Sequence, residues 1–160
     1  MDGYLVSACL LGLPTRYDGG CCPIPRLIHL AARGLAIPFC PEVAGGLSIP
    51  RFPAEIVGGD GQVVLDGRAR VLTIDGQDVT RAFLIGAQQA LEIAQRLGIR
   101  QAVLKDESPS CGCHHIYDGT FSGHLVSGQG VTVALLQRNG VTVLSEEDLS
   151  SENHKRHQGH

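Results

Sequence analysis

The stretch YLVSAC at residues 4–9 determines the fold that we expect of this chain. Its first five residues form an unbroken run of apolar and small side chains, which predicts a buried β-strand. Runs of similar length occur at 36–39, 101–104 and 141–144, and each is separated from the next by a longer segment. The chain therefore shows four candidate strands that do not follow one another directly.

Helices are predicted between these runs. Residues 78–97 carry apolar side chains at helical spacing, and Gly98 ends the pattern. Shorter helices are predicted at 25–33, which begins with a proline, and at 131–138, which is followed by Asn-Gly. Strands that alternate with helices predict an α/β fold in which helices flank a parallel sheet.

A small β-hairpin insertion is predicted between the second and third strands. Asp66-Gly67 lies between the runs 62–65 and 69–74, and Asp-Gly is a strong signal for a two-residue hairpin turn. The segments 41–59 and 105–129 are expected to be loops. Long loops in compact domains are often functional.

The length of 160 residues suits one domain. We expect a single domain over residues 1–149 and a disordered polar tail over 150–160. The net charge is −3 and no cluster of Lys and Arg is present, so stable nucleic-acid binding is not expected. The apolar run at 4–13 is too short to cross a membrane and no basic residue precedes it, so we expect a cytoplasmic protein.

Three of the six cysteines occupy related places in this layout. Cys9 and Cys40 directly follow the first and second predicted strands, and Cys111 lies in the loop after the third. The carboxyl ends of parallel strands meet at one edge of a sheet, where ligands of α/β proteins bind. Strands lie about 4.8 Å apart, so the three thiols can surround one small object. A cysteine at one strand end is more often a core residue, and no CxxC pair marks a zinc or ferredoxin site.

Polar residues lie close to two of these cysteines. Glu42 comes two residues after Cys40, and Ser108 and Ser110 precede Cys111. A carboxylate and a hydroxyl near a metal can position water and transfer protons. The alternatives are a solvated loop charge for Glu42 and turn capping for the serines.

Six segments together resemble the TudS-type thiouracil desulfidases, in their order and spacing as well as in their residues. The segments are LVSACLLG (5–12), RYDGG (16–20), CPEVAGGL (40–47), RFPAEIVGGDG (51–61), ESPSCG (107–112) and IYDGTFSG (116–123). The resemblance covers nearly the whole chain except the tail. It implies a Rossmann-like α/β fold.

The resemblance also implies a cofactor and a reaction. Cys9, Cys40 and Cys111 would hold a [4Fe–4S] cluster in which one iron has no protein ligand. Glu42 and Ser108 would be catalytic, with Ser110 as the alternative serine. The implied reaction is non-redox: the open iron binds the sulfur, activated water attacks the pyrimidine carbon, and hydrogen sulfide leaves.

The implied substrate is free thiouracil or 4-thiouridine monophosphate. Family members that act on thiolated tRNA tend to carry an additional domain, which favours a small substrate here. Arg16 and Lys105 are candidate phosphate contacts, and structural ion pairs are the alternative for both.

Two features depart from the family pattern. The pair Cys21-Cys22 is unexpected, and we expect it to be incidental. Cys113, His114 and His115 follow the expected cluster loop, and one of them could supply a fourth ligand or bind another metal.

Other functions are compatible with the same cysteines. Three thiols with an open water position could form a zinc hydrolase, and a cluster could serve electron transfer or sensing instead of catalysis. The identity of the bound metal distinguishes a zinc hydrolase from the iron–sulfur proteins. Release of sulfide distinguishes a desulfidase from the other three functions.

Overall fold

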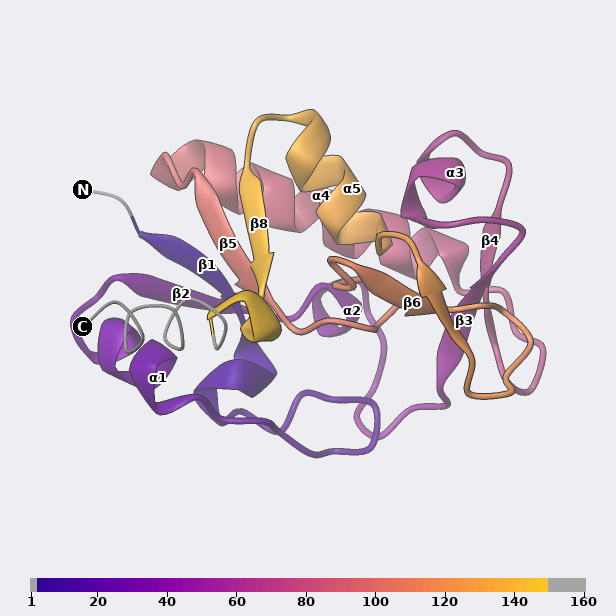
Figure 1. Ribbon diagram of the computed structural model, residues 1–160, viewed down its shortest axis with the longest axis horizontal. Helices are drawn as coiled ribbons and strands as arrows, with labels where there is room; N and C mark the ends of the chain where they lie inside the picture. The colour runs from indigo at the N-terminus through magenta and orange to yellow at the C-terminus, as the bar shows by residue number, and fades with distance from the viewer. Residues whose placement is uncertain (1–2, 150–160) are drawn as a thin grey trace, which may run out of the picture.

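The computed structural model describes residues 3–149 and contains a four-stranded parallel sheet in the order β2-β1-β5-β8 (Figure 1). The four strands agree with the four apolar runs of the sequence. They are β1 (Tyr4–Ser7), β2 (Ala36–Phe39), β5 (Gln101–Leu104) and β8 (Thr142–Ser145). The parallel α/β fold is thus confirmed. The tail that we expected to be disordered, residues 150–160, lies outside the described residues.

Helices cover both faces of this sheet. The helices predicted from the sequence are present as α1 (Pro25–Ala32), α4 (Thr80–Leu97) and α5 (Val131–Arg138). Side chains alternate between the faces of a strand. Leu5 of β1 accordingly packs in one core cluster with α4 and α5, and its neighbour Val6 packs in another with α1. No helix within residues 3–149 combines the length and the apolar character that a membrane crossing requires.

The predicted hairpin is wrong in its first strand. The second strand is present as β4 (Arg70–Thr73), but it pairs antiparallel with β3 (Ala54–Val57), in a segment expected to be loop. Residues 62–65 instead belong to a short helix, α3 (Gly61–Leu65). The Asp60 carboxylate accepts hydrogen bonds from the backbone N–H of Gln62 (3.1 Å) and Val63 (3.4 Å), and this N-cap favours a helix.

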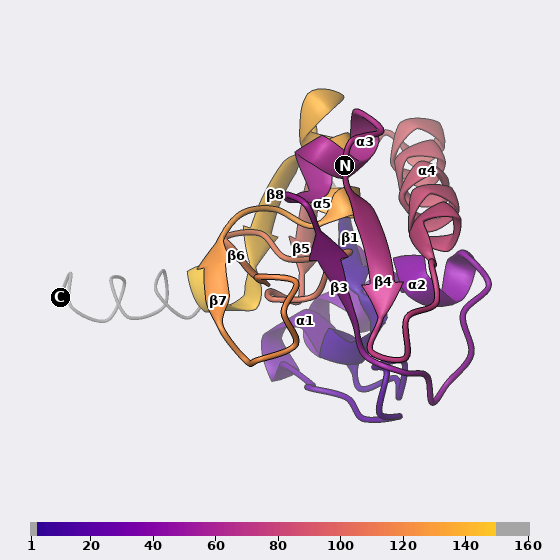
Figure 2. The ribbon, with the colours of Figure 1, turned by 90° about the vertical axis from the view of Figure 1, so that its right-hand side faces the viewer.

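The two segments expected to be loops contain further short elements. Residues 8–11 form η1 (Ala8–Leu11), and the 41–59 segment begins with α2 (Pro41–Ala44). The 105–129 segment contains an antiparallel hairpin of β6 (His115–Tyr117) and β7 (Leu125–Ser127). Figure 2 shows this hairpin beside the β3–β4 pair, and Figure 1 shows that both lie at the end of the molecule opposite α1. Strands such as β3 (AEIV) and β6 (HIY) lack the continuous apolar run that revealed the strands of the parallel sheet.

Helix α2 packs closely against α4. A Cβ atom added to Gly86 of α4 would overlap the Pro41 carbonyl, and one added to Gly45 would overlap the Ala82 carbonyl. The two backbones therefore approach to a distance that only glycine permits. This contact holds the segment that carries Cys40 and Glu42.

We predict that Gly86→Ala destabilises the protein by about 1–3 kcal/mol, because α2 and α4 must move apart. Alanine is a better helix former than glycine by about 1 kcal/mol, so a net loss would show that the overlap dominates. Denaturant unfolding measures the effect, with Gln88→Ala on the exposed side of α4 as the control. Equal or greater stability of Gly86→Ala would contradict the close approach.

Candidate active site

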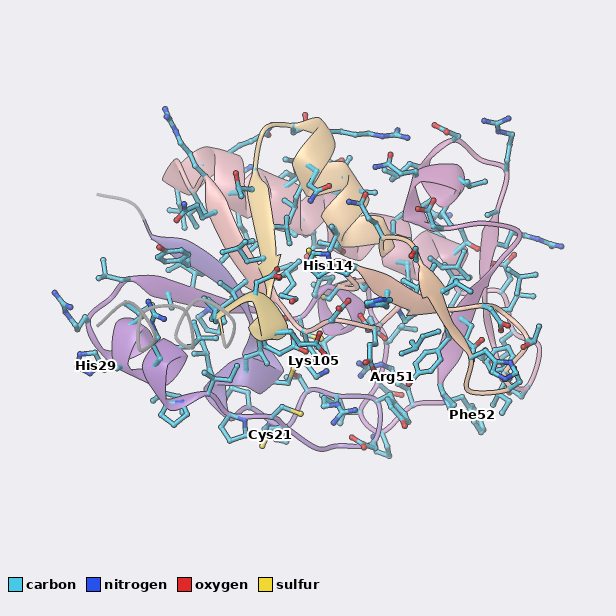
Figure 3. The ribbon with its side chains drawn as sticks, in the orientation of Figure 1. Cys21, His29, Arg51, Phe52, Lys105 and His114 are labelled. Atoms are coloured by element: carbon cyan, nitrogen blue, oxygen red, sulfur yellow. The ribbon has the colours of Figure 1, made fainter. Side chains whose placement is uncertain are left out.

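A cavity of about 370 Å³ lies at the carboxyl edge of the parallel sheet and is bounded on its far side by β3 and the β6–β7 hairpin. Apart from the alternative serine, Ser110, every residue for which the sequence predicted a role in the site lines this cavity. These residues are Cys9, Arg16, Cys40, Glu42, Lys105, Ser108 and Cys111. Figure 3 labels one of them, Lys105, together with Arg51, and both lie in the middle of the molecule.

The register of the sheet brings the three cysteines to this edge. Ser7, the last residue of β1, lies opposite Phe39, the last residue of β2. Cys40 follows at once as the N-cap of α2, and Cys9 lies in η1 directly after β1. Cys111 comes from the turn after β5, the strand on the other side of β1.

The surroundings of two of the cavity thiols, Cys9 and Cys111, suppress their ionisation. Burial, together with the neighbouring thiols of Cys22 and Cys40, raises the pKa of Cys9 to about 11. Burial also raises the pKa of Cys111, and Cys40 and Glu42 add to that effect. The Sγ atom of Cys40 donates to the Thr15 carbonyl at 3.8 Å. Three thiolates in one cavity need a cation among them, and a bound metal centre would supply it.

Glu42 lies in the first turn of α2 and forms an ion pair with Arg51. The distance from Arg51 Nε to Glu42 Oε1 is 3.3 Å, and the two side chains are only 8% (Arg51) and 15% (Glu42) exposed. Burial raises the pKa of Glu42, and Arg51 offsets this only in part. A carboxylate of raised proton affinity suits a general base.

Arg51 was not identified from the sequence as a site residue. Besides the ion pair, its guanidinium donates to the carbonyls of Thr15 (3.0 Å) and Ser48 (3.2 Å). Arg51 thereby fixes Glu42 relative to the loop at Thr15, whose carbonyl also accepts the hydrogen bond from Cys40. The signal available in the sequence was its place at the start of the RFPAEIVGGDG motif.

The two serines near Cys111 have different surroundings. Ser108 lines the cavity, and its Oγ accepts a hydrogen bond from the Cys111 backbone N–H at 2.7 Å. Ser110 is fully buried outside the cavity lining and pairs with Thr132 Oγ1 at 2.8 Å. Of the two alternatives, Ser108 is the one that faces the cavity.

The loop that carries Ser108 and Cys111 is organised by Asp106, another residue that the sequence did not single out. Its buried Oδ1 accepts backbone hydrogen bonds at both ends of the loop. The donors are Glu107 (2.8 Å), Cys113 (2.8 Å), His114 (3.2 Å) and His115 (3.3 Å). Burial alone would raise the pKa of Asp106, but these bonds lower it overall. Asp106 thus stays ionised as the anchor of the loop.

The two candidate phosphate contacts differ in their partners. Lys105 Nζ forms an ion pair with Glu146 Oε1 at 3.1 Å, so the structural alternative holds for it. Arg16 donates to the Sγ atom of Cys22 at 3.3 Å. Within residues 3–149 no carboxylate lies within ion-pair distance of Arg16.

The residues that depart from the family pattern lie beside the cavity and do not line it. Cys21 is exposed, and Cys113 is buried with its Sγ donating to the Val143 carbonyl at 3.4 Å. The donor atoms of Cys113, His114 and Asp148 lie within 4.8 Å of one another and could hold a metal ion. This group is separate from the three cysteines of the cavity.

Fold and site together define a class: an α/β protein with three thiols, a buried carboxylate and a hydroxyl at the carboxyl edge of its parallel sheet. Such a site is suited to catalysis with a thiolate-bound metal centre. The family model described as 2-thiouracil desulfurase matches residues 4–148. The chain therefore belongs to the 2-thiouracil desulfurase family.

Two relatives are similar over nearly their whole length. One is the Bacillus subtilis (strain 168) protein YbbK, described as uncharacterized, which is 44% identical over 146 residues, or 91% of this chain and 97% of the relative. The other is a solved structure of the [4Fe-4S]-dependent thiouracil desulfidase TudS. It is 47% identical, has a TM-score of 0.84, and the match covers 94% of this chain and 95% of that one.

The donor set of the cavity fits an iron–sulfur cluster. Among the described residues that line it, the sulfur donors are Cys9, Cys40 and Cys111, and no histidine is present. Thiolates are the ligands that iron–sulfur clusters use, and three of them leave one iron of a four-iron cluster free for another ligand.

We predict a pH-dependent contribution of His114 to stability. Its hydrogen bond to Asp148, at 2.9 Å, raises the pKa of His114 above the ordinary 6.5. Burial alone would raise the pKa of Asp148, but hydrogen bonds from Ser145 and His114 lower it below 3.8. The stabilisation by His114 is complete below pH 6.5 and is lost as the pH rises through its raised pKa.

The stability difference between wild type and His114→Gln should therefore be larger at about pH 5.5 than at about pH 8.5, and stay below about 1 kcal/mol at this half-exposed pair. Thermal unfolding at both values measures it. The exposed His29, also labelled in Figure 3, offers a matched control in His29→Gln. If the stability difference between wild type and His114→Gln is the same at both pH values, the ion pair does not contribute to stability.

Proposed function

We propose that this chain is an iron–sulfur-dependent desulfidase of hydrolase type. It would convert thiouracil or 4-thiouridine monophosphate to the oxo form and release hydrogen sulfide. The observation that carries the proposal is that Cys9, Cys40, Cys111, Glu42 and Ser108 line one cavity. Family membership and the likeness to TudS support it.

In this proposal Cys9, Cys40 and Cys111 hold a [4Fe–4S] cluster in which one iron has no protein ligand. When bound, the cluster supplies a Lewis acid for the sulfur of the substrate. The protein residues would hold the ring and transfer the protons. No electron is gained or lost, because a C=S bond and water give a C=O bond and hydrogen sulfide.

Glu42 is the proposed general base. It would take a proton from water as the water oxygen attacks the ring carbon that bears sulfur. The buried Arg51 holds this carboxylate in place. The Oγ of Ser108 accepts the Cys111 N–H, so its own O–H remains able to donate to the departing sulfur or the attacking water.

Arg16 is the stronger of the two candidate phosphate contacts. It lines the cavity and has no carboxylate partner within residues 3–149, whereas Lys105 is paired with Glu146. A guanidinium can bind phosphate by two parallel hydrogen bonds. This supports a nucleoside monophosphate as substrate, and the net charge of −3 favours a small molecule over a nucleic acid.

A cytoplasmic location is also proposed. All six cysteines are free thiols, and thiols persist in reducing compartments.

The first prediction concerns activity itself. Protein purified and reconstituted without oxygen should release sulfide from 4-thiouridine monophosphate, with uridine monophosphate as the co-product. Cys111→Ala should lose both the absorbance of the cluster and the sulfide, because two thiols cannot hold the cluster. Sulfide assay, chromatography and iron analysis measure these outcomes.

The matched control is Cys21→Ala, since this exposed thiol does not line the cavity. It should retain both iron and turnover. A cluster-loaded protein that releases no sulfide from this substrate or from thiouracil would contradict the proposal and favour redox transfer or sensing. A colourless protein that holds zinc would favour a zinc hydrolase.

The variant Glu42→Gln tests the proposed base. The glutamine oxygen can still accept the Arg51 hydrogen bond, so the fold and the cluster should be retained. Loss of the base should lower kcat by about 10²- to 10⁴-fold. Steady-state kinetics and the cluster absorbance measure the two effects, with the exposed Glu92→Gln as control. Normal turnover by Glu42→Gln would show that another group activates water.

A further inference from the structure

Glu55 is a buried carboxylate in the wall of the cavity with no role in the chemistry described above. It lies on β3, it is 8% exposed, and it lines the cavity. Within residues 3–149 no Lys, Arg or His lies within ion-pair distance of it. A buried carboxylate without a cation must be stabilised by hydrogen bonds.

One oxygen of Glu55 is fully used by the protein. Its Oε1 accepts the backbone N–H of Gly119 at 2.9 Å and that of Phe121 at 3.1 Å. Both donors lie in the tip of the β6–β7 hairpin. Glu55 thereby fastens this hairpin to β3.

The tip of the hairpin packs closely against β3 where it meets Glu55. Phe121 has φ of 56° and Gly119 has φ of 92°, and a Cβ atom added to Gly119 would lie 2.6 Å from the Ile56 carbonyl oxygen. Phe121 and Tyr117 of the same hairpin line the cavity. The orientation of the Glu55 carboxylate is therefore fixed before any ligand binds.

The other oxygen of Glu55 has no protein partner. No donor within residues 3–149 lies within hydrogen-bond distance of Oε2. The atom is nevertheless accessible, because it is not one of the unpaired oxygens within these residues that are sealed from solvent. Because Glu55 is otherwise buried, the cavity is the space to which Oε2 is open. The site thus contains a carboxylate oxygen that is held in place and lacks a donor.

We propose that Glu55 Oε2 accepts a hydrogen bond from the N3–H group of the thiolated pyrimidine and so selects the substrate. This inference rests on the proposed function. N3 lies between C2 and C4, so its N–H adjoins the thiocarbonyl whether sulfur is at C2 or C4. A carboxylate acceptor favours rings that carry this N–H and rejects rings with an unprotonated or substituted N3.

Glu55→Gln separates this role from the docking of the hairpin. The glutamine oxygen must remain on the Gly119 and Phe121 amides, because the opposite orientation would turn its NH₂ against two donors. The NH₂ then replaces Oε2 and faces the substrate N–H as a second donor. The variant retains the hairpin contacts and loses the proposed recognition.

The test measures kcat/KM of wild type and Glu55→Gln on 4-thiouridine monophosphate and on its N3-methyl derivative. Glu55→Gln should lower kcat/KM about 10- to 100-fold on the unmodified substrate, as expected for loss of a hydrogen bond to a charged group. On the N3-methyl substrate the two proteins should be equal within about threefold, because neither can form the bond. The exposed Glu92→Gln should match wild type on both substrates.

A loss of the same size on both substrates would show that Glu55 only holds the hairpin, and it would overturn the inference. An unchanged kcat/KM for Glu55→Gln would also overturn it. Thermal unfolding checks that the variant is folded.

Calorimetric binding of uridine monophosphate and its N3-methyl derivative gives the same comparison without turnover. Suppose that no thiopyrimidine releases sulfide, but wild type binds uridine monophosphate at least 10-fold more tightly than Glu55→Gln does, and both proteins bind the N3-methyl compound equally. The proposed function then fails, and the recognition by Glu55 stands. If sulfide is released, but the difference between wild type and Glu55→Gln is the same with and without the N3-methyl group in both kinetics and binding, the recognition fails and the proposed function stands.

Discussion

The parallel pairing of β1 with β2 on one side and β5 on the other is the constraint on which the site depends. Ser7 is level with Phe39, and Val6 is level with Val103, so the three strands end at the same edge. Cysteines that are 31 and 71 residues apart in the sequence therefore reach one cavity. A slip of one residue in either pairing would also turn buried side chains to the opposite face of the sheet. The packing of both faces against helices thus fixes the position of the thiols.

Bringing these thiols together has an electrostatic cost. Burial raises the pKa of Cys9 and of Cys111, and the neighbouring thiol of Cys40 raises both further. Arg16 and Lys105 act in the opposite direction on the pKa of Cys9, but burial and the neighbouring thiols outweigh them. A positively charged metal centre would reverse the balance, because it stabilises thiolates directly. The arrangement is thus suited to binding such a centre and poorly suited to three free thiolates.

The sequence predicted the elements whose signal is local. Strands buried on both faces appear as short apolar runs, and α4 has a long apolar stripe, so the parallel sheet and its helices were found. The first hairpin strand was misplaced because the Asp60 cap outweighed the strand character of the following residues. Arg51 and Asp106 were missed for another reason. Their roles come from contacts with Thr15, with Glu42 and with backbone N–H groups of a folded loop, none of which periodicity can reveal.

The strands that the sequence missed, β3, β6 and β7, lie on the side of the cavity that faces the sheet edge. The sheet edge supplies the thiols, Glu42 and Ser108, while β3 and the β6–β7 hairpin supply Glu55, Tyr117 and Phe121. Both hairpins are inserted between strands of the sheet, and neither pairs with it. Their residues therefore take no part in the register that places the cysteines. If recognition resides in the hairpins and chemistry at the sheet edge, the two tasks are carried by separate parts of the fold, and a change in the hairpins can alter the ring that is accepted while the cluster ligands stay in place.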